Sequence, residues 1–268
     1  MEWLLSPNAF DLANPQVLPG KGEIDLPPSQ QDKTPPPDSA GQSISTSDQP
    51  SLLRYPDDKL TPFQNLVSAL ILSKPLSHRL GLRSIQTLLN PPFSIRTLGD
   101  LDEAGYEGRR KIMWEARTQH KEKTATQLGD LVNGIREICS PSSHEEDLSA
   151  LSGVRGQIQG KSPEEARETV ERMLKKIKGI GPGVVGIFLR RVQGDWGEVF
   201  PFADERGLKA ARAFGLVKEG DGAEALRGAV GGEGDEGRGR YVRVLDVLVG
   251  LELEKKVEEA VGMAGGGK

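Results

Sequence analysis

The stretch Ile177-Lys178-Gly179-Ile180-Gly181-Pro182-Gly183-Val184-Val185 decides the fold, because it separates two segments with helical periodicity. The first segment begins at Ser162-Pro163-Glu164-Glu165, which has the serine N-cap, N1 proline and N3 glutamate of a capped helix. Glycines end that helix, and Pro182 suits the first turn of a second one. Apolar residues recur at helical spacing on both sides of the turn: Ala166, Val170, Met173, Leu174, Ile177, Val184, Val185, Phe188, Leu189 and Val192. We expect a helix, a tight turn and a helix over 162–192.

A turn of this kind presents free backbone N–H groups at the start of its second helix, where the helix dipole favours an anion. Glycine lets a phosphate oxygen approach the backbone closely. We therefore predict a phosphate-binding site at Gly179, Gly181 and Gly183, flanked by Lys178. The alternative is an ordinary corner between helices, with glycines only for chain reversal, since short glycine motifs often match by chance.

The charge distribution favours a polyanionic partner. The chain has a net charge of −4, yet residues 161–191 carry eight Lys or Arg against four Glu. A second basic cluster contains Arg109, Arg110, Lys111, Arg117, Lys121 and Lys123, with Glu115 and Glu122. Paired basic surfaces suit phosphate neutralisation, although a charge run can also be only a solvated helix face.

One carboxylate follows the hairpin at Phe202-Ala203-Asp204. Asp204 is a candidate catalytic residue. It is also an ideal N-cap for a helix that begins at Glu205 and is closed by Gly215. The two roles are compatible.

Two motifs in order resemble the helix-hairpin-helix (HhH-GPD) DNA glycosylase superfamily related to endonuclease III. The first is Leu60-Thr61-Pro62-Phe63-Gln64-Asn65-Leu66-Val67-Ser68-Ala69-Leu70-Ile71-Leu72-Ser73, which resembles the helix that opens the catalytic domain. The second is the hairpin followed by the run from Phe200 to Leu216. The resemblance covers about Leu60 to Leu216. It implies an all-α, two-lobed fold with double-stranded DNA across the cleft and a base flipped out of the duplex.

In this resemblance Asp204 matches the catalytic aspartate, which would stabilise an oxocarbenium-like sugar and help position or deprotonate the attacking water. Bifunctional members carry a lysine shortly after the second hairpin glycine, and here that place is Gly183. We therefore expect a monofunctional glycosylase of base excision repair, without lysine-dependent lyase activity. Glu205, Arg206 and Ser73-Lys74-Pro75 depart from the family pattern and leave room for a catalytically inactive DNA-binding protein. An unrelated helical protein with a chance hairpin is a third possibility.

Aromatic side chains on the loop before Asp204 could stack on a flipped base. Trp196 and Phe202 are the candidates for this base pocket, and Trp114 is not. We expect no metal and no cofactor. A single cysteine, Cys139, cannot hold an iron–sulfur cluster, and His78, His120 and His144 lack metal-ligand spacing.

The domain organisation follows from composition. Residues 1–51 are predicted to be largely disordered, because 27–50 is rich in Pro, Ser, Gln and Asp. Within this segment Trp3-Leu4-Leu5 and Phe10 either form a docking motif or fold back. Residues 52–268 form the helical domain, with an acidic, glycine-rich mobile loop at 220–239 and a last helix at about 240–261.

The chain lacks the patterns of a signal peptide, a mitochondrial presequence and a transmembrane segment. We expect a soluble intracellular monomer that binds no membrane, and a DNA substrate points to the nucleus.

Overall fold

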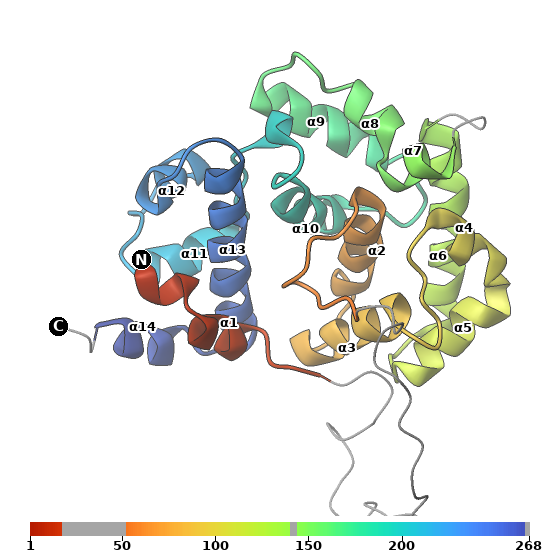
Figure 1. The fold of residues 1–268 in the computed structure, drawn as a ribbon, viewed down its shortest axis with the longest axis horizontal. Coiled ribbons are helices and arrows are strands. Elements are labelled where there is room, and N and C mark those ends of the chain that lie inside the picture. Colours follow the sequence, from red (N-terminus) through yellow and green to blue (C-terminus); the bar gives the residue numbers. More distant parts are fainter. Residues whose placement is uncertain (18–51, 140–143, 266–268) are drawn as a thin grey trace, which may run out of the picture.

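The computed structural model describes residues 1–17, 52–139 and 144–265 of the 268 residues. Within these ranges the chain forms fourteen α-helices and no strand, which confirms the all-α prediction. Figure 1 shows the terminal helices grouped on one side and α2 to α10 on the other. The buried apolar residues form two clusters that follow this division. None of the helices in the described ranges is long and apolar enough to cross a bilayer.

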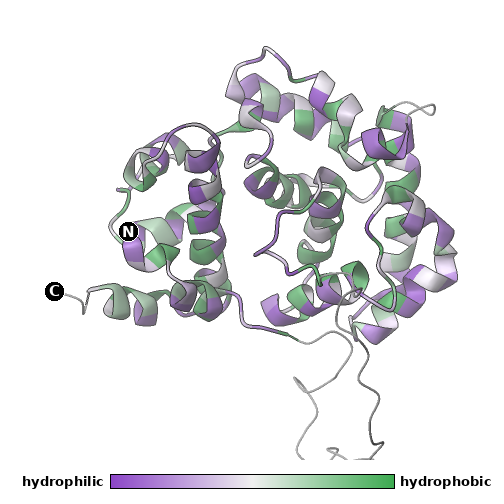
Figure 2. Cartoon of the chain, in the orientation of Figure 1, coloured by the Kyte–Doolittle hydropathy of each residue, from purple (hydrophilic) through white to green (hydrophobic). Residues whose placement is uncertain are grey.

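The first core is built by nine helices from the middle of the chain. They are α2 (Pro62–Leu72), α3 (His78–Leu89), α4 (Leu98–Glu103), α5 (Gly105–Glu115), α6 (Lys121–Cys139), α7 (Glu145–Ser149), α8 (Ser152–Gly156), α9 (Pro163–Leu174) and α10 (Pro182–Val192), followed by the short 3-10 helix η3 (Gly197–Val199). The helices α2 and α10 pack on each other and are largely hydrophobic (Figure 2). Their apolar faces place the start of α10 beside the end of α2.

The second core joins both ends of the chain. It contains the 3-10 helix η1 (Glu2–Leu5), α1 (Pro7–Ala13), α11 (Glu205–Ala213), α12 (Ala223–Val230), α13 (Gly234–Leu253) and α14 (Val257–Gly265). The long helix α13 packs against η1, α1, α11, α12 and α14. It therefore contacts every other element of this part. We call the helices around the first core the first lobe and those around the second core the second lobe.

Residues 1–17 are folded, which corrects the prediction of a largely disordered segment over residues 1–51 for this part of it. Leu4, Phe10 and Ala13 are buried in the second core. A Cβ at Gly250 of α13 would lie 2.5 Å from the carbonyl oxygen of Ala13, so this glycine permits close helix packing. Of the two alternatives for the N-terminal apolar residues, folding back is the one observed. Residues 18–51, including the stretch 27–50, lie outside the described residues.

The prediction of a mobile loop at 220–239 is wrong. Helix α12 occupies Ala223–Val230, and Leu226 and Val230 bury one face of it in the second core. The many glycines of this stretch favour a loop, but the link between α12 and α13 is short, and Gly231 and Gly232 reverse the chain there with positive φ. The last helix is also divided, because the chain turns at Lys255, whose φ is 58°.

Candidate functional site

The hairpin predicted over 162–192 is present as α9, a turn and α10. Ser162 and Glu165 form the capping box that starts α9, and Gly181 is the N-cap of α10. Among the described residues, the N–H groups of Gly179, Gly181 and Gly183 donate to no protein acceptor. Unpaired N–H groups at a helix N-terminus favour an anion.

Glycine occupies the three hairpin positions for different structural reasons. Gly179 has a φ of 90°, which glycine adopts without strain, so chain reversal explains it. Gly181 has an extended backbone that any residue adopts, and Gly183 lies in the first turn of α10. No described atom lies within 4 Å of a Cβ built at either position. Neither conformation nor packing requires glycine there, whereas close approach of a ligand would.

Lys178 and the second basic cluster are weaker evidence for an anion site than the hairpin glycines. The Lys178 side chain is exposed, and its Nζ lies 3.3 Å from Oδ2 of Asp130. Arg109 of the second basic cluster donates to the carbonyl oxygen of Leu101 at 2.9 Å instead of facing solvent, and burial lowers its pKa. Asp130 therefore neutralises part of the positive charge beside the hairpin.

Asp204 is the N-cap of α11, as the sequence predicted. Its Oδ1 accepts a hydrogen bond from the backbone N–H of Gly207 at 2.8 Å. Its Oδ2 accepts from Nη1 of Arg190 in α10, at 2.5 Å. The Asp204 side chain remains 25% exposed, whereas Arg190 is 7% exposed. Both carboxylate oxygens are thus fixed, and one of them links the two lobes.

A second ion pair lies beside the first. Arg191 of α10 pairs with the buried Asp246 of α13, and its guanidinium lies 5.3 Å from the ring centroid of Tyr55. Burial is the largest single influence on Arg190 and lowers its pKa, but the charges of Asp204, Tyr55 and Asp246 together outweigh burial, so the pKa is raised. Burial raises the pKa of Asp246, and the charge of Arg191 opposes this rise. Two adjacent arginines therefore tie the first lobe to α11 and α13.

Asp204 opens into a cleft of about 640 Å³ that lies between the two cores. Its walls come from the α2–α3 link, the start of α10, the start of α11 and the end of α13. Residues with polar or close-approach roles on these walls include Ser73, Lys74, Ser77, His78, Pro182, Gly183, Gly186, Arg190, Asp204, Glu205, Arg206 and Asp246. The structure therefore brings Gly183 of the hairpin and Asp204 to one cavity.

Lys74 stands at the cleft wall in the Ser73-Lys74-Pro75 link. Its Nζ donates to Oε1 of Gln127, whose amide lies against Gly179 of the hairpin turn. Burial, and then the charge of Lys123, lower the pKa of Lys74. Lys74 and Gln127 therefore connect this wall of the cleft to the hairpin turn.

His78 also lines the cleft, and sequence reasoning missed it. Its Nδ1 lies 3.2 Å from Oε1 of Glu254, and Nε of Arg79 donates to Oε2 of the same carboxylate at 3.0 Å. Burial lowers the pKa of His78, and Glu254 opposes this shift without cancelling it. The partners are 176 positions apart in the chain, so no local spacing could have revealed the pair.

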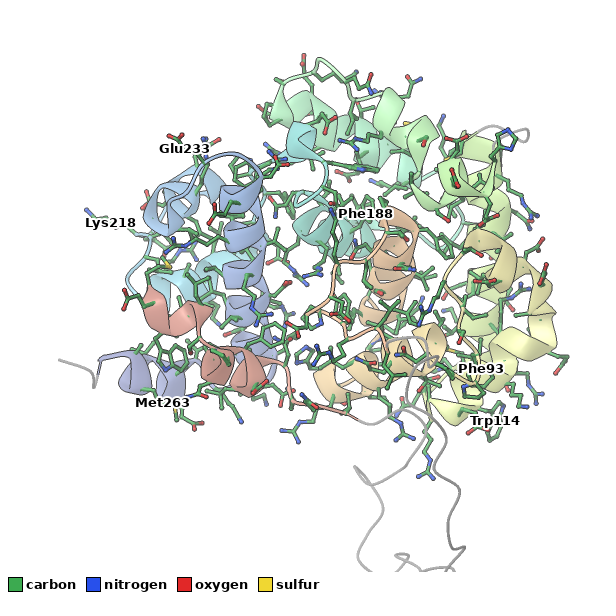
Figure 3. The ribbon with its side chains drawn as sticks, in the orientation of Figure 1. Phe93, Trp114, Phe188, Lys218, Glu233 and Met263 are labelled. Carbon is green, nitrogen blue, oxygen red and sulfur yellow. The ribbon has the colours of Figure 1, made fainter. Side chains whose placement is uncertain are left out.

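The aromatic candidates do not lie in the cleft wall. Trp196 is 1% exposed and packs edge-on against Phe188, with ring centroids 5.5 Å apart. Figure 3 shows Phe188 near the centre of the molecule, on α10. Trp196 is therefore a core residue, which corrects its assignment to the base pocket. Phe202 is half-buried, and its ring tip approaches Gly186, which lines the cleft.

A larger cavity, of about 890 Å³, holds neither Asp204 nor the hairpin glycines. Its charged side chains pair with each other: Lys59 with Asp195 at 2.6 Å and Arg243 with Asp57 at 2.7 Å. The smaller cleft is therefore the better candidate for chemistry.

Within the described residues, no cluster of His, Cys, Asp and Glu side chains is arranged to hold a metal ion. Comparison of the chain with protein-family models, curated proteins and solved structures found no match.

Proposed function

We propose that this chain is a monofunctional DNA N-glycosylase of base excision repair with an HhH-GPD-like fold. It would bind double-stranded DNA as a monomer in the nucleus and remove a damaged or mismatched base. The observation that carries the proposal is that Gly183 of the hairpin and the carboxylate of Asp204 line the same cleft. A phosphate held at the hairpin would bring the adjacent sugar toward Asp204.

The chemistry requires a fixed negative charge next to a developing positive one. Breaking an N-glycosidic bond leaves an oxocarbenium-like sugar, and a preoriented carboxylate stabilises it. The N–H of Gly207 and the guanidinium of Arg190 orient Asp204, while a quarter of its side chain stays exposed to the cleft. The cavity volume of about 640 Å³ lies in the range of ligand pockets, which suits a flipped base. Gly183 occupies the position where bifunctional relatives of the resembled superfamily carry the lysine that cleaves the strand. We therefore propose no lysine-dependent strand cleavage from this position.

A second candidate function is DNA binding without catalysis. The observation that favours it is the Arg190–Asp204 pair, because the guanidinium neutralises part of the charge that would face the sugar. Under this alternative, the hairpin binds phosphate and the carboxylate only joins the lobes.

Base release from defined duplexes separates the two. The panel contains duplexes with uracil, alkylated, oxidised and mismatched bases, and alkali reveals abasic sites afterwards. We expect the wild type to release one class of base and Asp204→Asn to lose this release while binding DNA. Asp235→Asn is the matched control, because Asp235 also pairs with an arginine, Arg238 at 2.6 Å, and lies outside the cleft. DNA binding without release from any duplex would favour the second candidate.

The phosphate site is tested separately. Gly181→Glu and Gly183→Glu place a negative side chain in open space, so the fold should persist. DNA affinity should fall, and the dependence of affinity on salt should become shallower because fewer counterions are released. Unchanged affinity in both variants would contradict the phosphate-binding role of the hairpin.

A further inference from the structure

The cleft holds a second group suited to proton transfer, the imidazole of His78. We propose that His78, oriented by Glu254, is the general base that takes a proton from the attacking water, while Asp204 stabilises the sugar cation. This inference rests on the proposed glycosylase function and divides its two tasks between two side chains.

The contact with Glu254 fixes the tautomer of His78. An ionised carboxylate only accepts hydrogen bonds, so the Nδ1 atom 3.2 Å from Oε1 of Glu254 carries the proton. In the neutral ring Nε2 then presents a lone pair. Nε2 has no hydrogen-bond partner among the described residues. It is also not one of their side-chain atoms that are both inaccessible to solvent and without a partner. Since His78 lines the cleft, this lone pair is available to a water there.

Glu254 is itself held in place. Its second oxygen accepts from Nε of Arg79 at 3.0 Å, and its side chain is 9% exposed. His78 is the first residue of α3, and Ser77 caps this helix. The backbone that carries the imidazole is therefore held in place as well. A base oriented by a carboxylate through its other ring nitrogen is a recurrent catalytic arrangement.

The oxygens of Asp204 are engaged in a different way. Gly207 donates to Oδ1 and Arg190 donates to Oδ2. Such a carboxylate is well placed to face positive charge, and each of its oxygens keeps one further lone pair. A neutral imidazole is a stronger proton acceptor than a carboxylate, and His78 lines the same cavity.

The protonation state agrees with this role. Burial lowers the pKa of His78, Glu254 raises it, and the positive charges of Arg190 and Arg206 lower it further, with a net decrease. The imidazole is thus neutral at pH 7 and ready to accept a proton. The charged or titratable groups that contact it or share the cleft with it are Glu254, Arg79, Tyr55, Lys74, Arg190, Asp204, Glu205, Arg206 and Asp246.

The step balances. The bond between C1′ and the base nitrogen breaks, and its electron pair leaves with the base, which takes a proton from solvent. The oxygen of water bonds to C1′, and the proton that this water loses goes to Nε2 of His78 and then to solvent. One water is consumed, and the products are the free base and an abasic sugar.

The test compares His78→Asn with wild type in single-turnover base release across the same panel of duplexes. Asparagine keeps a donor near the Nδ1 position and removes the Nε2 lone pair. We expect release to fall by about 10²- to 10⁴-fold with DNA affinity unchanged. His120→Asn is the matched control, because His120 is exposed and its backbone has a φ of 55°, which asparagine tolerates. Circular dichroism checks that each variant is folded.

The pH profile separates catalysis from structure. The wild-type rate should fall as pH drops below the lowered pKa of His78, because the base becomes protonated. His78→Asn should lose this acid limb. Glu254→Gln removes the charge that raises the pKa of His78, so the limb should move to lower pH. A merely structural pair would leave the position of the limb unchanged, and this second variant decides the matter if His78→Asn is unfolded.

The possible failures are distinguishable. Wild-type release that is lost in Asp204→Asn but kept in His78→Asn, with the same acid limb, overturns the role of His78 alone. No release by wild type from any duplex overturns the proposed function together with this inference.

Discussion

The ion pair between Arg190 and Asp204 joins the two lobes, and its removal should be measurable as a loss of stability. In Asp204→Asn the asparagine still caps α11, but the Arg190 guanidinium, 7% exposed, loses its counterion. Breaking a fully buried pair costs about 3–5 kcal/mol. Asp204 is 25% exposed and the charge of Asp246 also acts on Arg190, so we expect the lower value of about 2 kcal/mol.

A double-mutant cycle isolates the pair. Arg190→Met keeps the aliphatic stem and removes the charge, and Arg190→Met with Asp204→Asn removes both charges. The double variant should be more stable than the sum of the two single losses predicts, by about 2 kcal/mol.

The assay is urea unfolding followed by far-UV circular dichroism, which reports on the helices of both lobes. Asp235→Asn is the control, and its urea midpoint should equal that of the wild type, because Asp235 is 93% exposed. A coupling energy below about 0.5 kcal/mol would refute the reasoning that this pair holds the lobes together.

Three further outcomes are expected. The pKa of His78 is lowered on folding, whereas the histidine of the unfolded state has a pKa near 6.5, so the folded state binds fewer protons. Stability should therefore fall as pH drops below about 6.5. The urea midpoint of wild type should show this fall, and that of His78→Asn should fall less steeply. Gly250→Val should displace α1 from α13, because a Cβ there would lie 2.5 Å from a backbone oxygen of α1; hydrogen exchange of residues 9–13 should accelerate, and unchanged protection would contradict this packing. Trp196→Ala should lower the free energy of unfolding by about 3–5 kcal/mol, because Trp196 is 1% exposed. Trp114→Ala should lower it by less than about 0.5 kcal/mol, because Trp114 is 52% exposed at the edge of the molecule (Figure 3). Equal losses would contradict the core assignment of Trp196.

The sequence by itself determined the local elements. Helical periodicity and the capping box predict α9 and α10, and the residues after Asp204 predict its N-cap role at α11. These features depend on residues a few positions apart, so their physics is contained in short stretches of chain. Glycine content was a poorer guide, since α12 forms in a stretch that composition marked as a loop.

Only the tertiary structure decided which side chains share the cleft. Asp204 meets Arg190, and His78 meets Glu254, through the packing of two lobes built from distant parts of the chain. The same packing buries Trp196 in the core and folds residues 1–17 onto α13. Burial depends on the whole set of surrounding helices, and a one-dimensional pattern does not contain that set. The candidate catalytic carboxylate could therefore be found from the sequence, whereas its partners and the second candidate base required the fold.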